Sequence, residues 1–537
     1  MVPLSLFSLS LLAALTIVAD ARQTPSAAAD EVVALPGFTG ALPSKWYSGL
    51  LPLAADGATG RRMWSHYMYV ERVASPRAAS PAPLLLWSNG GPGASSMFGL
   101  LTEIGPLVFT GKSLKSGVPQ LVENLHSWSR DADILIFDAP PPIGFSFCDP
   151  PGPGGPGTSC GDWDDARTTR TNVLALKAFF QRFPALQARD LYLSGESYAG
   201  VYIPSLARAI LEAQDGGDPL LSKVNLRGFA VGDACVGTDV LCGDAGGPFF
   251  DVEFLGGHHQ FSRELYDKIY ATCGVVPLKT GTGITAACQA LLSEMHRQVG
   301  GYYEYALYDE CTYTNPFTQR LLRRFGATPG YHRWRGGQEG LAPAIKGALN
   351  DYACGTGQAL FAWVDLPEVR KALNVPIDSN WFCADNGLGF VYKVTEKNLM
   401  PFYIDVAVGK FASRGLRVLV YNGDVDPSIN SLAAQNWTSA LGLAVTRDWR
   451  PWTTDWCRKM GGYVTEFEGK FAFLTIRGAG HMVPQYKPVA AAAFMRAWLR
   501  NEPYPSFNAS CTSPPKFGRG AWEVDRGENS ELMGILE

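Results

Sequence analysis

The sequence has little of several features that mark other classes of protein. Basic residues are not in excess, because 46 Lys and Arg stand against 50 Asp and Glu among 537 residues, for a net charge of −4. A nucleic-acid partner or an anionic membrane surface would need a basic footprint, so neither is expected. Histidine is scarce, with 7 residues. No internal repeat is present, and beyond the N-terminus no apolar run approaches the length of a membrane span.

The first 21 residues are predicted to be a secretory signal peptide. Met1 to Val18 is an apolar run, and the small residues Ala19 and Ala21 that follow favour cleavage before Arg22. The start of the run lacks Lys and Arg. A membrane anchor is the alternative, but the run is short for that role. We therefore expect a secretory-pathway protein without a membrane span after signal removal, located in a lysosome or vacuole or outside the cell.

The cysteine count agrees with that compartment. The chain has 11 cysteines, and cysteines in a secreted chain indicate disulfide bonds. An odd number leaves at least one of them outside the intrachain pairs. Asn436 and Asn508 each begin an Asn-x-Ser/Thr sequence and would accept N-linked glycans if they lie on the surface.

Short apolar segments alternate with helical patterns, which predicts an α/β fold with a mostly parallel central sheet flanked by helices. The predicted buried strands are 84–88, 133–138, 191–193, 226–233, 416–422 and 471–477. The predicted helices are 168–183, 201–212 and 489–499.

The strand rhythm is lost between residues 234 and 384. Seven cysteines lie there: Cys235, Cys242, Cys273, Cys288, Cys311, Cys354 and Cys383. We interpret this stretch as an inserted, largely helical cap braced by disulfides. The predicted organisation is a signal peptide (1–21), a first part of the core (22–233), the cap (234–384), a second part of the core (385–511) and a polar tail (512–537).

Residues 190–204 have the pattern of a nucleophile elbow, a sharp turn between a strand and a helix that lifts a serine hydroxyl above the sheet edge. Ser197 is the serine, and Gly195 and Gly200 supply the small residues that so tight a turn needs. An ordinary glycine-rich turn is the alternative reading. The pattern gains weight only if an acid and a histidine follow in that order.

An acid and a histidine do follow, each after a predicted strand. Asp424 and Asp426 come after strand 416–422, and His481 comes after strand 471–477. The chain order Ser, Asp, His belongs to the α/β-hydrolases. His481 would take the proton of Ser197, and a buried carboxylate would orient the imidazole. We assign that role to Asp426, with Asp424 as the alternative; for His481 the alternative is a structural histidine in a glycine-rich loop.

A second glycine-rich turn, Asn89 to Gly93, follows the strand 84–88. Such a turn exposes backbone N–H groups that can bind an oxyanion. Taken alone, it is more simply a plain turn, because tight turns need Gly and Pro for their own geometry.

Together these motifs resemble the serine carboxypeptidase family, which includes yeast and plant carboxypeptidases and lysosomal cathepsin A. The matching segments are Trp87-Ser-Asn-Gly-Gly-Pro-Gly-Ala-Ser-Ser, Glu103-Ile-Gly-Pro, Gly195-Glu-Ser-Tyr-Ala-Gly-Val-Tyr-Ile-Pro, Tyr421-Asn-Gly-Asp-Val-Asp and Gly478-Ala-Gly-His-Met-Val-Pro. Weaker agreement runs from about residue 38 to residue 499. The resemblance implies an α/β-hydrolase fold and a serine-type carboxypeptidase that releases C-terminal residues from peptides or proteins through an acyl-enzyme, without a metal or other cofactor.

The resemblance also implies binding roles. Asn89, Gly90, Glu103 and Glu196 would bind the terminal carboxylate of the substrate, with Trp87 packed beside them. The backbone N–H groups of Gly91 and Tyr198 would form the oxyanion hole. Two glutamates can bind an anion if a shared proton keeps one of them neutral. Peptide cleavage is therefore expected to be best at acidic pH.

The sequence departs from the family pattern at two places. The family usually has a disulfide-bonded cysteine where this chain has Ala94, so Cys383, the candidate partner, is expected to be the unpaired eleventh cysteine. Cys148 with Cys160 and Cys235 with Cys242 are then the pairs favoured by proximity. In the loop that begins at Asp138, Pro142 replaces a family glycine.

Two other functions stay open at this stage. The same triad could transfer acyl groups to an alcohol or amine, as plant relatives of the family do. The fold could also serve as a protective or binding scaffold, although a scaffold has no need of a triad. A lipase-like esterase fits less well because it has no use for the carboxylate-binding cluster. A monomer and a homodimer are both compatible with the sequence.

Overall fold

The computed structural model describes residues 27–57, 59–73, 81–110, 113, 117–242, 246–309, 356–384 and 389–512. The predicted signal peptide (1–21), tail residues 513–537 and two of the cap cysteines, Cys311 and Cys354, lie outside these ranges.

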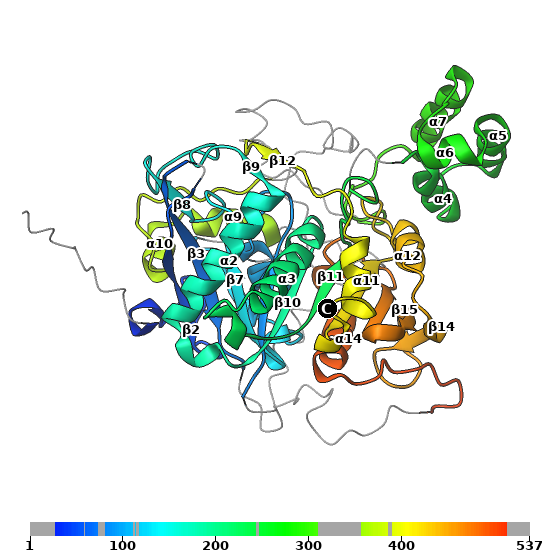
Figure 1. Cartoon of the computed structure of the whole chain (residues 1–537). Coiled ribbons are helices and arrows are strands. Elements are labelled where there is room, and N and C mark those ends of the chain that lie inside the picture. The colour runs from blue at the N-terminus through cyan, green and yellow to red at the C-terminus, as the bar shows by residue number, and fades with distance from the viewer. Residues whose placement is uncertain are drawn as a thin grey trace, which may run out of the picture.

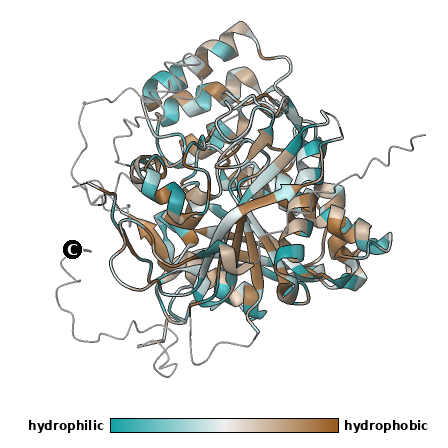
Figure 2. Cartoon of the chain, turned by 90° about the vertical axis from the view of Figure 1, so that its left-hand side faces the viewer, coloured by the Kyte–Doolittle hydropathy of each residue, from teal (hydrophilic) through white to brown (hydrophobic). Residues whose placement is uncertain are grey.

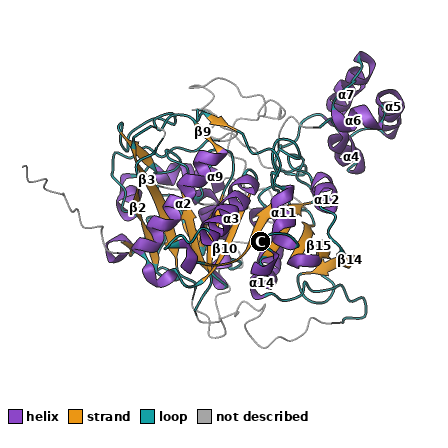
Figure 3. Cartoon of the chain, in the orientation of Figure 1, coloured by secondary structure: helices purple, strands orange, loops and turns teal. Residues whose placement is uncertain are grey.

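In the described part of the chain, a sheet of 12 strands forms the centre of the molecule (Figures 1 and 3). Its order is β1-β2-β3-β7-β4-β10-β11-β13-β16-β15-β14, and β8 pairs with β3. The six strands from β7 to β16 are parallel. Antiparallel strands extend the sheet on both sides. The carboxyl ends of the parallel strands therefore meet along one edge.

The strands of this sheet are β1 (Glu31–Val32), β2 (Trp46–Leu53), β3 (Arg62–Val70), β4 (Leu84–Ser88), β7 (Asp133–Phe137), β8 (Phe147–Asp149), β10 (Asp190–Glu196), β11 (Asn225–Gly232), β13 (Arg417–Gly423), β14 (Val445–Thr453), β15 (Met460–Phe467) and β16 (Phe471–Ile476). Two small sheets pair β5 (Leu107–Phe109) with β6 (Leu121–Glu123) and β9 (Trp163–Asp164) with β12 (Tyr392–Lys393).

The helices of the core are α1 (Met97–Gly99), α2 (Asp165–Arg182), α3 (Ala199–Asp215), α9 (Thr356–Val364), α10 (Pro367–Ala372), α11 (Met400–Ala407), α12 (Ser431–Ser439), α13 (Val483–Tyr486) and α14 (Pro488–Arg500). Helices α4 (Phe249–Gly257), α5 (Arg263–Cys273), α6 (Val275–Thr280) and α7 (Ala286–Val299) form the described part of the cap.

Two apolar cores lie on the two faces of the sheet. In β4, Leu84 and Leu86 join one core while Leu85 and Trp87 join the other, as the alternation of a strand requires. Helices α2 and α3 cover the first core, and α9 and α14 cover the second. Because both faces are buried, the central strands are almost continuous apolar runs, and Figure 2 shows the strands mostly brown and the outer helices marked with teal.

The elements predicted from the sequence agree closely with this architecture. The predicted strand 84–88 has the bounds of β4, and the predicted helix 168–183 begins three residues after the observed start of α2. The hairpin of β14 and β15 was not predicted. The first five residues of β14 are all exposed, so this edge strand carries no apolar alternation that would reveal it.

The described part of the cap is helical, as expected, and α4 to α7 project from the body as a separate lobe (Figure 1). The lobe has its own apolar core and the disulfide Cys273–Cys288. Residues 356–384 differ from the rest of the predicted cap. Trp363 and Leu360 are buried in a core of the sheet, and Trp363 Nε1 donates to the carbonyl of Pro36 at 2.7 Å. This stretch packs with the hydrolase core because α9 is apolar enough to be buried there.

Both disulfides expected from proximity are present, Cys148–Cys160 and Cys235–Cys242. Cys457–Cys511 is a further one, and it ties the end of the described chain to the β14–β15 hairpin.

A fully buried polar cluster, made by Ser48, His66 and Asp138, crosses from β2 to the end of β7. His66 Nδ1 lies 2.7 Å from Asp138 Oδ2, and its Nε2 lies 3.0 Å from Ser48 Oγ. Ser48 Oγ also donates to the carbonyl of Leu373 at 2.8 Å. All three polar side chains are shielded from solvent. The cluster satisfies its hydrogen bonds internally, as a buried polar group must.

Phe179 on α2 should be a main contributor to stability. Its ring is fully buried among Tyr67, Tyr69, Phe137 and Phe183. Replacing a buried Phe with Ala removes apolar contacts and leaves a cavity, so Phe179→Ala is expected to lower the free energy of unfolding by about 3–5 kcal/mol.

The measurement is denaturant-induced unfolding followed by circular dichroism. Arg170→Ala is the matched control, because Arg170 is an exposed residue of the same helix, and it should change stability by less than about 0.5 kcal/mol. Equal effects of the two substitutions would contradict the proposed core.

Candidate active site

Ser197 lies in a strained turn between β10 and α3. Its φ is +63°, a left-handed conformation that a non-glycine residue adopts only under constraint. The Ser197 N–H donates to the carbonyl of Gly232 at 2.9 Å, which holds the turn against β11. A Cβ at Gly195 or Gly200 would lie within 2.7 Å of Ala199 Cβ or Ala234 Cβ, so both positions need glycine. This is the geometry expected of a nucleophile elbow.

The turn after β4 approaches this elbow closely. A Cβ at Gly90 would lie 2.9 Å from Ser197 Cβ and closer still to the Tyr198 nitrogen. Among the described residues, no hydrogen bond from the backbone N–H of Gly91 or Tyr198 is found. The two residues predicted to bind an oxyanion are therefore brought together beside Ser197.

His481 and Asp426 are joined by a short hydrogen bond. His481 Nδ1 lies 2.7 Å from Asp426 Oδ2, and both side chains are buried. Asp426 also accepts hydrogen bonds from the N–H groups of Ser428 (2.8 Å) and Ile429 (3.3 Å). Asp424, the alternative acid, accepts from the N–H of Gly478 at 2.6 Å instead. The geometry favours Asp426 as the partner of His481. Asp424 instead binds the loop that precedes His481.

A segment of the cap covers the imidazole. The Tyr305 ring lies 4.8 Å from the His481 ring, tilted by 31°, and the Tyr305 carbonyl accepts the His481 backbone N–H at 2.7 Å. Leu307 N–H donates to the carbonyl of Val425 at 2.9 Å. This contact could not be predicted from the sequence, because Tyr305 lies where the strand rhythm is lost.

Asn89 has a side-chain orientation that its neighbours determine. Its Oδ1 accepts hydrogen bonds from Trp87 Nε1 and from the Gly99 N–H, each at 2.9 Å. Its Nδ2 donates to Glu196 Oε1 at 2.9 Å. Because an amide nitrogen has two protons, Asn89 keeps one for a ligand. Trp87 thus lies beside the predicted carboxylate site and orients it.

Glu103 and Glu196 are both buried, with 3% of each residue exposed. Glu103 lies in the π-helical turn η2 (Leu100–Ile104), an irregularity common at functional sites. Burial raises the pKa of Glu103 to about 7. Burial, and next the charge of Glu103, raise the pKa of Glu196 well above its ordinary value.

The two carboxyl groups face each other. Within the described residues, neither oxygen of Glu103 nor Oε2 of Glu196 receives a hydrogen bond from another donor, and the two carboxyl groups lie close enough to share a proton. Buried polar atoms are normally satisfied, and exceptions concentrate where a ligand supplies the missing bond. The pair is therefore suited to hold a proton and donate it to a bound anion.

Asp233 is a buried acid that sequence reasoning placed only as the last residue of a strand. It follows β11 at φ +41°, is inaccessible to solvent, and lies against Asp426. Its position directly after a parallel strand, like those of Ser197, Asp426 and His481, is the signal that could have identified it.

Asp165 supports the elbow from the other side. Its Oδ1 accepts hydrogen bonds from the hydroxyl groups of Tyr198 (2.7 Å) and Tyr392 (2.8 Å), and its Oδ2 accepts from the N–H groups of Thr395 and Glu396. The Tyr198 side chain is thus anchored to the first turn of α2. Nothing in the sequence pattern of Asp165 distinguishes it from a helix-capping acid.

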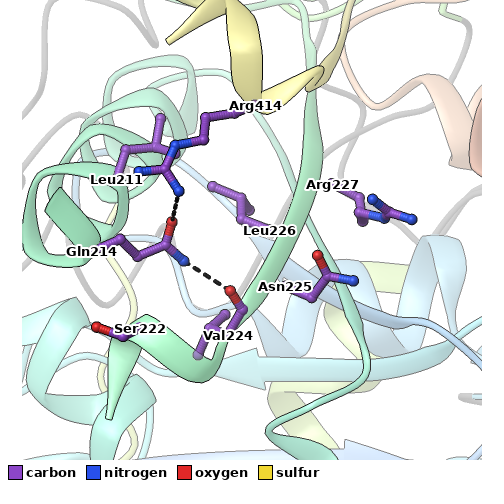
Figure 4. A pocket seen from close by; sticks show the side chains of 8 residues that line it. All are labelled: Leu211, Gln214, Ser222, Val224, Asn225, Leu226, Arg227 and Arg414. Atoms are coloured by element: carbon purple, nitrogen blue, oxygen red, sulfur yellow. Dashed lines mark hydrogen bonds between the residues drawn. The ribbon is translucent and has the colours of Figure 1, made fainter. Parts of the chain in front are cut away.

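The pocket in Figure 4 is separate from these residues. It has a volume of about 300 Å³ and lies at the amino end of β11, between Arg227 and Arg414. Arg414 reaches Gln214 Oε1, and Gln214 Nε2 donates to the carbonyl of Val224 (Figure 4). The catalytic candidates follow the carboxyl ends of the parallel strands, at the opposite edge of the sheet.

Comparison with known proteins identifies the family. A model described as "Serine carboxypeptidase" matches residues 36–501. The chain belongs to the serine carboxypeptidase family. Serine carboxypeptidase 1 of Hordeum vulgare is 30% identical, over 87% of this chain and 92% of its own length. The lysosomal protective protein of Mus musculus is also 30% identical, over 88% and 94%.

A solved structure shows the same fold. Kex1(delta)p, a prohormone-processing carboxypeptidase from Saccharomyces cerevisiae, aligns with a TM-score of 0.65 at 20% identity, over 89% of this chain and 97% of its own. The predicted α/β-hydrolase fold is therefore confirmed.

The two departures from the family pattern lie near the Asn89–Gly93 turn. Cys383 Sγ accepts a hydrogen bond from the N–H of Ser95, the residue after Ala94, at 3.4 Å. This contact places Cys383 where a partner for a cysteine at position 94 would lie. The loop containing Pro142 ends at Gly144, which exchanges hydrogen bonds of 2.6 and 3.0 Å with Phe382. Neither change touches Ser197, Asp426 or His481.

The two candidate acids should respond differently to amide substitution. Asp426→Asn presents the imidazole with an amide in place of a carboxylate and should lower kcat by about 10³–10⁴-fold. Asp424→Asn keeps an oxygen that can accept the Gly478 N–H, so activity should stay within a few fold of wild type. Steady-state hydrolysis of a C-terminal dipeptide substrate measures both. A larger loss with Asp424→Asn would transfer the role to Asp424.

Proposed function

We propose that this protein is a serine carboxypeptidase that removes residues from the C-termini of peptides or proteins through an acyl-enzyme formed on Ser197. The observation that carries the proposal is the buried carboxyl pair Glu103–Glu196, in which Glu196 accepts a hydrogen bond from Asn89 and directly precedes the strained turn of Ser197. The family membership supports it, because relatives over nearly the full length are named serine carboxypeptidases.

Recognition of the terminal carboxylate follows from the donors at this site. Asn89 Nδ2 retains one N–H beyond its bond to Glu196. A protonated carboxyl of the glutamate pair supplies an O–H, and Gly90 lies in the same turn. Charge-assisted hydrogen bonds to a carboxylate are stronger than neutral ones. A peptide with a free C-terminus would therefore be held with its last bond near Ser197.

Acylation then uses the groups assembled at the strand ends. Ser197 Oγ attacks the last peptide carbonyl carbon as His481 Nε2 takes the hydroxyl proton. Asp426 holds the imidazole through Nδ1 at 2.7 Å and stabilises the imidazolium. The oxyanion is bound by the N–H groups of Gly91 and Tyr198. The imidazolium protonates the leaving amine, and the released product is the C-terminal amino acid.

Deacylation repeats these steps with water as the nucleophile. His481 takes a proton from water, the hydroxide attacks the ester carbonyl, and the proton returns to Ser197 Oγ as the shortened peptide leaves. Every proton is thus exchanged between Ser197, His481 and the substrates, without a cofactor.

We also propose a secretory location. The described residues contain four disulfides, which form in oxidising compartments. Asn436 and Asn508 are both exposed and could carry glycans. None of the helices in the described ranges is long and apolar enough to cross a bilayer.

The first prediction concerns the substrate carboxylate. At pH 5 the enzyme should release one residue from a peptide with a free C-terminus, and the same peptide amidated at its C-terminus should react about 10- to 100-fold more slowly, because it cannot form the charge-assisted bonds. Release is followed by mass spectrometry. Ser197→Ala should abolish both reactions. Equal rates for the two peptides with the wild-type enzyme would contradict the carboxylate-binding role.

The second prediction concerns pH. Ionisation of the glutamate pair replaces a hydrogen-bond donor with a negative charge, so the KM for the free peptide should rise as pH passes about 7, the pKa of Glu103. We expect a rise of up to about 10-fold between pH 5 and 8, because about a tenth of a group with this pKa keeps its proton at pH 8. In the double variant Glu103→Gln/Glu196→Gln both substituted side chains are neutral at every pH. Its KM should therefore be almost independent of pH.

The amidated peptide is the control for this pH series, because its KM should not follow the glutamate pair. The free energy of unfolding should also depend on the ionisation of Glu103. The folded-state pKa of Glu103 lies above its ordinary value of 4.5, so its contribution is fully present below pH 4.5 and is lost as pH rises to about 7. A flat KM in the wild type would contradict the shared proton.

A further inference from the structure

Asp233 is a buried acid that the mechanism above does not use. One carboxylate oxygen of Asp233, one of Asp426 and one ring nitrogen of His481 all lie within 4.8 Å of one another. The backbone of Asp233 is held in place, because its N–H donates to the carbonyl of Tyr421 at 2.8 Å. Two fully buried carboxyl groups this close cannot both ionise cheaply, so one of them keeps a proton.

The hydrogen bonds indicate which acid keeps the proton. Asp426 faces three donors: the N–H groups of Ser428 and Ile429, and His481 Nδ1 at 2.7 Å. The described donors to Asp233 are weaker. The Gly423 N–H is shared between its two oxygens at 3.0 and 3.3 Å, and Asn422 Nδ2 lies at 3.2 Å. Asp426 is therefore the better stabilised anion.

The surrounding charges also favour a proton on Asp233. Burial raises the pKa of Asp233 well above its ordinary value, and the charges of Asp426 and Glu196 add to that effect. His481 Nδ1 is bonded to Asp426 Oδ2 at 2.7 Å, so the imidazole stabilises the negative charge on Asp426. With its proton retained, the Asp233 carboxyl group can donate a hydrogen bond.

We propose that Asp233 is a positioning residue of the catalytic triad: its carboxyl O–H donates a hydrogen bond to Asp426 and holds that carboxylate in the orientation that His481 requires. The proposal rests on the proposed function in one respect, the role of Asp426 as the triad acid. It extends the triad by one residue, from the end of β11 to the loop after β13. Asp233 acts through Asp426 and touches no substrate.

The backbone of Asp233 offers a matched pair of variants. At φ +41°, both Gly and Asn are tolerated. Asp233→Gly removes the donor, and Asp233→Asn keeps a donor in a side chain of almost the same shape that cannot ionise. Asp239→Gly is the control, because it removes an exposed carboxyl from the same loop.

The measurement is the rate at which a fluorophosphonate labels Ser197. In this reaction Ser197 Oγ attacks phosphorus, fluoride leaves, and His481 takes the hydroxyl proton, so the rate reports the triad without a peptide. Asp233→Gly should lower the rate about 10- to 100-fold, the worth of one hydrogen bond to a charged group. Asp233→Asn should restore a rate close to wild type, and Asp239→Gly should leave it unchanged.

A second background distinguishes positioning from general damage. In Asp426→Ala the acceptor is gone, so Asp233→Gly should cause no further loss there, whereas a loss of folded structure would slow both backgrounds equally. Thermal unfolding checks that each variant is folded. If Asp233→Gly is unfolded, Asp233→Asn decides alone, because an amide that donates should sustain labelling.

Three outcomes would overturn the proposal: wild-type labelling by Asp233→Gly, a rate for Asp233→Asn as low as that for Asp233→Gly, or equal slowing in both backgrounds. Failure of the proposed function is a separate result. A wild-type protein that labels rapidly but releases no C-terminal residue would refute the peptidase and leave this test intact.

Discussion

The site depends on the close approach of three backbone segments around Ser197. The left-handed turn of Ser197 is held by Gly232 on one side and by the Gly90 turn on the other. Because β4, β10 and β11 are adjacent and parallel, their carboxyl ends bring the Gly90 turn, Ser197 and Asp233 to one place. A side chain on any of the close-packed glycines would separate these segments. Strain in one residue is thus supported by a large, rigid sheet.

Buried acids are the second organising feature of the site. Glu103, Glu196, Asp233 and Asp426 are all shielded from solvent; the charge of Glu103 raises the pKa of Glu196, and the charges of Asp426 and Glu196 raise the pKa of Asp233. Charge repulsion at low dielectric makes full ionisation unfavourable, so the chain of carboxyl groups retains protons where an isolated glutamate or aspartate would lose them. The Glu103–Glu196 pair and the candidate triad are therefore electrostatically connected through Glu196.

Sequence patterns predicted the candidate residues at the strand ends but not the residues that pack around them. Strand ends followed by Gly and a polar residue identified Ser197, Asp426 and His481, since turn chemistry is local. The choice between Asp424 and Asp426 needed the direction of each side chain, which two residues of the same type do not reveal. Tyr305 and Asp165 contact the site from distant segments, and such contacts leave no local trace. Asp233 was placed on a strand although its chemistry belongs to the loop beyond it.

The buried trio Ser48, His66 and Asp138 shows what geometry alone leaves undecided. It has the same three residue types and the same short Asp–His bond as the candidate triad. The hydrogen bond between its serine and its histidine, however, runs in the opposite direction. Ser48 directs its proton to the carbonyl of Leu373, so its oxygen faces His66 as an acceptor. A hydroxyl whose proton points away from the imidazole cannot be deprotonated by it. Ser48 also lies within strand β2 and lacks the left-handed turn that presents Ser197, so the trio is a structural cluster.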